Sequence, residues 1–137
     1  MFVAAILILT VYFNATPIPC VVDTGSMLML VSAAQTVTIP ELSELAEPVR
    51  IQTATGEVLE LERRQVAHVA TGDLHWSDVQ VVIVPEGQAL IVDCILGLDV
   101  LSRQPLTIDW QRRAIVAAAE WRPDFAEKEH QTLDCYR

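Results

Sequence analysis

The feature that most constrains the fold is a succession of short apolar or alternating runs, each closed by turn residues. Such runs suit β-strands, which are about 3–10 residues long and alternate their side chains between two faces. The runs cover residues 6–13, 18–22, 27–31, 49–53, 58–62, 66–70, 79–84, 106–110 and 114–118. Turn-forming residues such as Asn, Gly, Asp and Pro separate them. We therefore expect an all-β domain of roughly seven or eight strands, either a small barrel or a sandwich.

One short helix is expected in the last third of the chain. Asp99 is a favoured helix N-cap and Pro105 a common terminator, so residues 100–104 fit one or two helical turns. Residues 40–48 are bracketed by prolines and carry glutamates. We expect this segment to form an exposed loop or a single helical turn.

Length and charge limit the possible functions. A chain of 137 residues allows one compact domain, which we place at residues 1–121 and follow with a polar tail at 122–137. The net charge of −9 and the lack of a basic stripe argue against nucleic-acid binding. Residues 2–13 are nearly all apolar, but a membrane span needs about 20 such residues. We expect a buried strand there and no membrane span within this chain.

Cysteine and histidine spacing gives no sign of a disulfide framework or a metal site. Cys20, Cys94 and Cys135 are odd in number and widely separated, without a CxxC pair. The simplest interpretation is a reducing compartment, and so a cytoplasmic location. The three histidines are scattered without ligand spacing, and nucleotide-binding glycine loops are missing. We expect no metal and no cofactor.

The residues that carry chemistry are Asp23-Thr24-Gly25, directly after the apolar pair Val21-Val22. This order presents a carboxylate in a turn at the end of a buried strand. Gly25 has no Cβ, so a ligand backbone can approach closely. The hydroxyls of Thr24 and Ser26 can orient the carboxylate or brace the loop. The alternative is an ordinary polar turn, because a tripeptide of this kind also arises by chance.

One carboxylate is not enough to activate water for hydrolysis of a peptide bond. Two carboxyl groups a few Å apart share a proton, so that one acts as general base and the other as general acid. The sequence contains one Asp-Thr-Gly and no second copy. A C2 dimer would supply the pair, because the symmetry axis brings Asp23 next to its own copy.

Two separate motifs resemble those of the retropepsins. Residues 21–26 resemble the active-site loop of that family, and Ile95-Leu96-Gly97 resembles its later apolar-apolar-glycine motif. Residues 94–101 and 106–110 are similar to the retroviral-like protease domain of DNA-damage-inducible proteins and to single-domain bacterial clan-AA peptidases. The resemblance covers residues 5–120. It implies a closed acid-protease barrel and a homodimeric aspartic endopeptidase, with Asp23 catalytic and extended polypeptides as substrates.

The resemblance also implies a flap and a substrate pocket. The alternating runs at 49–53 and 58–62 flank a glycine-containing turn, the pattern of a β-hairpin, at the place of the family's flap. The expected flap residues are Thr53, Ala54, Thr55, Gly56 and Glu57. The expected pocket residues are Met27, Leu28, Ile95, Leu96 and Gly97. Viral retropepsins carry acidic residues at the positions of Met27 and Leu28, so nearby subsites here should be more apolar.

Other interpretations of the same residues stay open. A hairpin at 49–62 could be an ordinary sheet connection, and Ile95 and Leu96 could simply pack in the core. The domain could be a binding or dimerisation module that has lost useful activity. A glycosidase with a carboxylate pair would need two acids in one cleft. Asp99 is expected to cap its helix rather than to take part in catalysis. The apolar N-terminal strand and the strand ending near Ala118 are the candidate dimer contacts.

Overall fold

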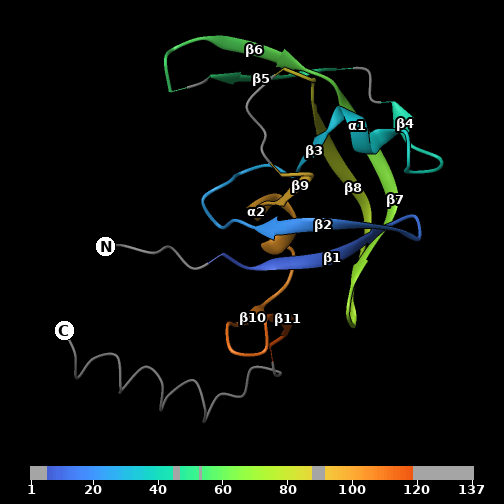
Figure 1. Cartoon of the computed structure of the whole chain (residues 1–137), viewed down its shortest axis with the longest axis vertical. Coiled ribbons are helices and arrows are strands. Elements are labelled where there is room, and N and C mark those ends of the chain that lie inside the picture. The colour runs from blue at the N-terminus through green and yellow to red at the C-terminus, as the bar shows by residue number, and fades with distance from the viewer. Residues whose placement is uncertain (1–5, 45–46, 53, 88–91, 119–137) are drawn as a thin grey trace.

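A computed structural model describes residues 6–44, 47–52, 54–87 and 92–118. It is made of strands with two short helices (Figure 1). The strands are β1 (Ile8–Phe13), β2 (Thr16–Val22), β3 (Leu30–Ser32), β4 (Ser43–Glu44), β5 (Val49–Gln52), β6 (Val58–Leu61), β7 (Arg63–Thr71), β8 (Leu74–Val84), β9 (Cys94–Leu96), β10 (Leu106–Asp109) and β11 (Ala114–Ala117). The helices are α1 (Ala33–Thr36) and α2 (Leu98–Leu101).

The main sheet closes into a barrel. Its strand order is β1-β2-β9-β3-β8-β7-β4, and β1 also pairs with β7, which joins the two sides of the sheet. The hairpins β5–β6 and β10–β11 form separate two-stranded sheets at opposite ends of the molecule (Figure 1). The predicted all-β barrel with little helix is confirmed.

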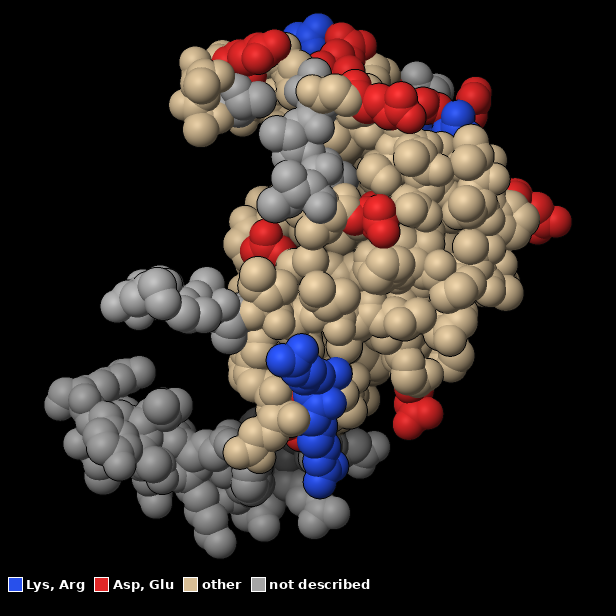
Figure 2. Space-filling view, viewed as in Figure 1, with Lys and Arg blue, Asp and Glu red and all other residues tan. Residues whose placement is uncertain are grey.

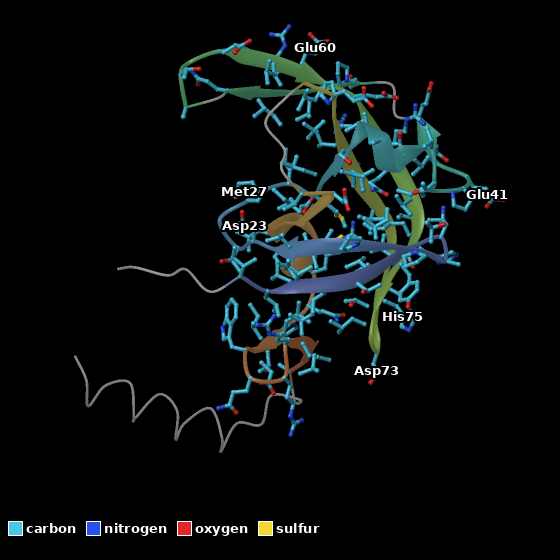
Figure 3. All side chains as sticks on the ribbon, in the orientation of Figure 1. Asp23, Met27, Glu41, Glu60, Asp73 and His75 are labelled. Atoms are coloured by element: carbon cyan, nitrogen blue, oxygen red, sulfur yellow. The ribbon has the colours of Figure 1, made fainter. Side chains whose placement is uncertain are left out.

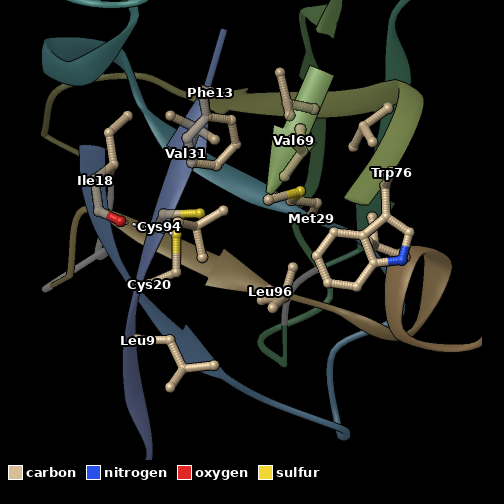
Figure 4. Packing of buried hydrophobic residues seen from close by; sticks show 14 of the residues in the cluster. Leu9, Phe13, Ile18, Cys20, Met29, Val31, Val69, Trp76, Cys94 and Leu96 are labelled. Atoms are coloured by element: carbon tan, nitrogen blue, oxygen red, sulfur yellow. Dashed lines mark hydrogen bonds between the residues drawn. The ribbon is translucent and has the colours of Figure 1, made fainter. Parts of the chain in front are cut away.

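Alternation of side chains explains how the barrel encloses its core. In β1, Leu9, Val11 and Phe13 point inward, while the residues between them are exposed. Phe13 packs with Ile18, Met29 and other buried side chains from β2, β3, β7, β8 and β9 (Figure 4). Asn14 and Ala15 take positive φ angles in the tight turn between β1 and β2, as the favoured hairpin turns require.

The strand pairing around β9 places the Asp-Thr-Gly segment. β9 lies between β2, to which it is parallel, and β3, to which it is antiparallel. The chain from β2 to β3 must therefore pass over the end of β9. Residues 23–29 make this passage, and we call them the 23–29 loop. The loop thus lies against the residues that follow β9.

Three local predictions differ from the structure. The expected strand at 27–31 begins only at Leu30, because the preceding residues are bonded to α2. Helix α2 begins one residue before the expected cap: its N-cap is Gly97, and Asp99 lies inside the first turn. In the expected loop at 40–48, Ser43 and Glu44 form β4 by pairing with β7, while residues 45–46 lie outside the described part.

Some expectations fall outside what the structure describes. The predicted tail at 122–137 and the N-terminal residues 1–5 lie outside the described residues, so the domain boundaries stay a prediction. Within the described ranges, no helix has the length and apolar character needed to cross a membrane. The cytoplasmic location stays a prediction. Helix α1 was not expected from the sequence.

Candidate active site

Asp23 stands where β2 ends and the 23–29 loop begins. Its backbone N–H donates to the carbonyl oxygen of Leu96, 3.1 Å away, so β9 fixes the start of the loop. Its carboxylate Oδ1 accepts a hydrogen bond of 2.9 Å from the backbone N–H of Gly25. The side chain is half-buried, and Asp23 and Met27 lie on the same side of the molecule in Figure 3. The predicted carboxylate in a turn after a buried strand is therefore present.

The remaining loop residues divide into exposed and braced ones. Thr24 and Gly25 are exposed. A Cβ added to Gly25 would come 3.1 Å from the Asp23 carboxylate oxygen, tighter than an ordinary contact. The Ser26 hydroxyl donates to the carbonyl oxygen of Leu28 at 2.8 Å, and so braces the loop as the sequence suggested.

The first turn of α2 binds the second half of the loop. The backbone N–H of Leu98 donates to the Ser26 carbonyl at 2.8 Å, and that of Asp99 donates to the Met27 carbonyl at 3.2 Å. Close packing accompanies these bonds: a Cβ on Gly97 would lie only 2.4 Å from the Leu28 carbonyl oxygen. The glycine of the Ile-Leu-Gly motif is therefore required by the loop that it touches.

The Asp99 side chain makes a contact that the sequence did not reveal. One carboxylate oxygen accepts from the backbone N–H of Met29 at 3.1 Å, across 70 positions of sequence, and the other accepts from Val100 N–H at 2.9 Å. Burial raises the pKa of Asp99, and the hydrogen bonds from Met29 and Val100 oppose that rise only in part. No local pattern could indicate a partner so far along the chain.

The expected pocket residues have different environments. Met27 is 71 % exposed beside Asp23, whereas Leu28 and Ile95 are half-buried. Leu96 is fully buried and belongs to the hydrophobic core, and Gly97 is also buried. Leu96 therefore touches the site through its backbone carbonyl, which holds Asp23. A role in substrate binding for these five residues stays a prediction.

The hairpin expected to be a flap is present as β5–β6. It projects on the side of the molecule where Asp23 lies (Figures 1 and 3). Ala54, Thr55, Gly56 and Glu57 are exposed at its tip, with Gly56 at a φ of 86°, while Thr53 lies outside the described residues. One face of the hairpin is partly buried and apolar, formed by Val49, Ile51, Leu59 and Leu61, and its opposite face is exposed.

Charge is unevenly distributed over the molecule. Acidic side chains gather on the β5–β6 hairpin and the adjoining end of the barrel, while Arg112 and Arg113 lie at the opposite end in the β10–β11 turn (Figure 2). Arg64 offsets part of the acidic charge through its ion pair with Glu62, at 2.7 Å. Among the described residues, no group of His, Cys, Asp and Glu side chains has the arrangement of a metal site.

Comparison with known proteins agrees with this geometry. The model of the family described as gag-polyprotein putative aspartyl protease matches residues 9–103. No curated protein sequence matches the chain.

Two solved structures have a similar fold. A retropepsin-like aspartic protease from Rickettsia conorii superposes with a TM-score of 0.55 at 16 % identity, over 76 % of this chain and 75 % of that one. The EIAV protease complexed with the inhibitor HBY-793 superposes with a TM-score of 0.57 at 20 % identity, over 69 % of this chain and 84 % of that one. The chain therefore belongs to the gag-polyprotein aspartyl protease family and has the retropepsin-like fold of clan AA.

Proposed function

We propose that this protein is an aspartic endopeptidase that cleaves extended polypeptides as a C2 homodimer. The observation that carries the proposal is the position of Asp23: it follows a buried strand of a retropepsin-like fold, its carboxylate is bonded to Gly25, and its side chain is partly exposed. This is the arrangement that a carboxylate needs in order to meet both a water molecule and a substrate.

Two copies of Asp23 across a symmetry axis would complete the site. As in aspartic proteases generally, two carboxyl groups at close range share one proton, because both cannot ionise easily. The ionised carboxylate removes a proton from water, which attacks the peptide carbonyl carbon. The protonated carboxyl group donates its proton to the carbonyl oxygen. The resulting tetrahedral intermediate breaks down as the C–N bond cleaves and the leaving amine takes up a proton.

Exposed apolar side chains support the dimer. Ile6, Ile8, Met27, Trp110 and Val116 are each between 48 and 71 % exposed. Ile6 and Ile8 lie at or just before the start of β1, and Trp110 and Val116 come from the β10–β11 hairpin, the segments expected to make the dimer contact. In addition, the β10–β11 hairpin pairs with no other strand of the described chain, so its edges have backbone groups free to pair with a second subunit.

The surroundings of Asp23 favour substrates with apolar side chains beside the cleaved bond. Met27 is exposed next to Asp23, and the β5–β6 hairpin has an apolar face that includes Ile51 and Leu59. If this hairpin closes over a bound peptide as a flap, it would exclude water and hold the peptide extended.

The direct test compares the wild type with Asp23→Asn on a mixed peptide library from mildly acidic to neutral pH, with products read by mass spectrometry. Asp73→Asn is the matched control, because Asp73 lies at the tip of the β7–β8 hairpin, far from Asp23 (Figure 3). We expect cleavage by the wild type and the control, and none by Asp23→Asn. A folded dimer without any cleavage would favour a binding or dimerisation module.

Subunit mixing tests whether the site is shared. If each active site needs Asp23 from both subunits, a ninefold excess of Asp23→Asn chains should leave about one-tenth of the wild-type chains in fully wild-type dimers. Activity per wild-type chain should fall to about the same fraction after the subunits exchange. Activity that stays constant per wild-type chain would show that each chain works alone.

A further inference from the structure

We propose that Asp99 is a positioning residue for catalysis, whose side chain holds the 23–29 loop in the conformation that presents Asp23. The inference rests on the proposed function for the meaning of that loop. The contact itself is a property of the fold, so it can be tested whether or not the protein cleaves peptides.

In the described chain, the Asp99 carboxylate makes the one side-chain hydrogen bond between the 23–29 loop and the α2 segment, whose apolar side chains Met29 and Val100 also share the core. Oδ2 accepts the backbone N–H of Met29, the last residue of the loop, at 3.1 Å. Oδ1 accepts the backbone N–H of Val100, in the same turn of α2 as Asp99 itself, at 2.9 Å. The carboxylate is thereby fixed at one oxygen by its own helix and holds the loop with the other.

The loop is held at both ends by the same short segment of chain. Its first residue, Asp23, donates its backbone N–H to the Leu96 carbonyl at 3.1 Å, and its last residue donates to Asp99. Between these ends, Leu98 and Asp99 donate backbone N–H groups to the loop carbonyls of Ser26 and Met27. Backbone bonds therefore satisfy the middle of the loop. At its exit into β3, Val82 N–H donates to the Met29 carbonyl at 2.9 Å, and the Met29 N–H is bonded by the Asp99 side chain.

A carboxylate suits this position better than another polar group. The two N–H groups need two acceptor oxygens, and an ionised carboxylate has no donor of its own. An asparagine would offer one oxygen and would turn an NH₂ group toward the second N–H. A serine hydroxyl would be too short to bridge the two segments. Asp99→Asn should therefore keep one of the two bonds, and Asp99→Ala neither.

Helix stabilisation alone does not account for this side chain. An acidic residue in the first turn of a helix favours that helix through its dipole. Helix α2, however, spans only the four residues Leu98–Leu101. In addition, burial raises the pKa of Asp99 despite its hydrogen bonds and the nearby positive charge of Arg103, so the folded protein holds the ionised form at a cost. Asp99 bonds the loop although burial disfavours its ionised form, which fits a positioning role.

The experiment compares wild type, Asp99→Ala and Asp99→Asn by two independent readouts. The first is amide hydrogen exchange, followed by NMR, at Met29 and through the 23–29 loop. The second is kcat and KM for a peptide that the wild type cleaves. Thr71→Val is the matched control, because it removes another partly buried hydrogen bond, from Thr71 to the Thr10 carbonyl at 2.9 Å, away from the loop.

We expect the Met29 amide to exchange at least about tenfold faster in Asp99→Ala, with a smaller change in Asp99→Asn, because an N–H that loses its acceptor becomes open to solvent. We expect kcat/KM of Asp99→Ala to fall by about tenfold or more, since small displacements of catalytic groups are costly. Asp99→Asn should recover part of this loss. Thr71→Val should stay within about twofold of wild type in both readouts, apart from any loss of global stability.

Each outcome decides the proposal. Wild-type exchange at Met29 in a folded Asp99→Ala protein would overturn it, and so would unchanged kcat/KM in both variants of an active enzyme. If Asp99→Ala does not fold, Asp99→Asn carries the same two tests. If the wild type cleaves no peptide, the exchange result alone decides whether Asp99 holds the loop, and the failure of the proposed function is recorded separately.

Discussion

A methyl group at residue 97 would test how tightly α2 and the 23–29 loop are packed. The backbone of Gly97 has φ −99° and ψ 178°, which any residue can adopt, so Gly97→Ala introduces no backbone strain. The added Cβ would instead lie 2.4 Å from the Leu28 carbonyl oxygen and 3.0 Å from that of Ser26. An ordinary contact begins at 3.4 Å, so the loop backbone must move by about 1 Å.

The cost of this movement follows from overpacking. Extra methyl groups in a packed site typically destabilise a protein by about 1–3 kcal/mol, and a clash with backbone belongs at the upper end of that range. For a domain of this size, each kcal/mol lowers Tm by roughly 4 °C, so we expect a decrease of about 8–12 °C. Because 1 Å displacements of catalytic groups can reduce activity about a hundredfold, kcat/KM should fall even well below Tm.

Calorimetry or thermal circular dichroism measures the stability effect, and two other glycines supply the controls. Gly72→Ala should cost about 1 kcal/mol, because its φ of 56° is unfavourable for alanine although nothing lies within 4 Å of the new Cβ. Gly25→Ala should change Tm little but should disturb Asp23, whose carboxylate oxygen would be 3.1 Å away. A Gly97→Ala protein with wild-type Tm would refute the packing of α2 against the loop.

Two further predictions concern titratable side chains. Burial raises the pKa of Asp99 above its ordinary 3.8, so the folded protein holds the proton more tightly than the unfolded chain. The contribution of Asp99 to the free energy of unfolding should then decrease as pH rises from about 4 through the folded pKa. Urea titrations measure this free energy for wild type and Asp99→Asn. The difference, wild type minus variant, should be larger at pH 4 than at pH 7. Burial and the neighbouring Cys20 raise the pKa of the Cys94 thiol. In a Cys135→Ser variant, Cys20 and Cys94 should therefore not react with a thiol reagent at pH 8 until urea unfolds the protein. Rapid labelling without urea would contradict their burial.

The parts of the fold that the sequence predicted are those encoded locally. The β5–β6 hairpin follows from two alternating runs around a glycine turn, and the position of Asp23 follows from a polar turn after an apolar strand. In each case, side chains near one another in sequence determine the conformation. The same holds for β1, whose alternation matches its inward and outward faces.

The parts that sequence reasoning missed depend on distant contacts. β4 consists of two exposed residues that become a strand only because β7 lies beside them. Met27 and Leu28 are apolar and were expected in a strand. The Met27 carbonyl, however, accepts from α2 and the Leu28 carbonyl from the Ser26 hydroxyl, and pairing with β9 starts at Leu30. Asp99 shows a typical capping pattern, yet its partner is 70 residues away. Periodicity carries no information about such partners.

If the protein is the homodimer proposed above, the contacts around Leu96 and Asp99 predict that each subunit holds much of its 23–29 loop in place through its own chain. The hydrogen bonds from Leu96, Leu98 and Asp99 to the loop lie within one chain, so these particular contacts do not themselves require a partner. In the proposed homodimer, association would then bring together two loops that are already bonded to α2. Activity lost on dilution should therefore return fully on concentration, because dissociation leaves the halves intact. Activity lost in Gly97→Ala should not return on concentration, because there the half-site itself is displaced.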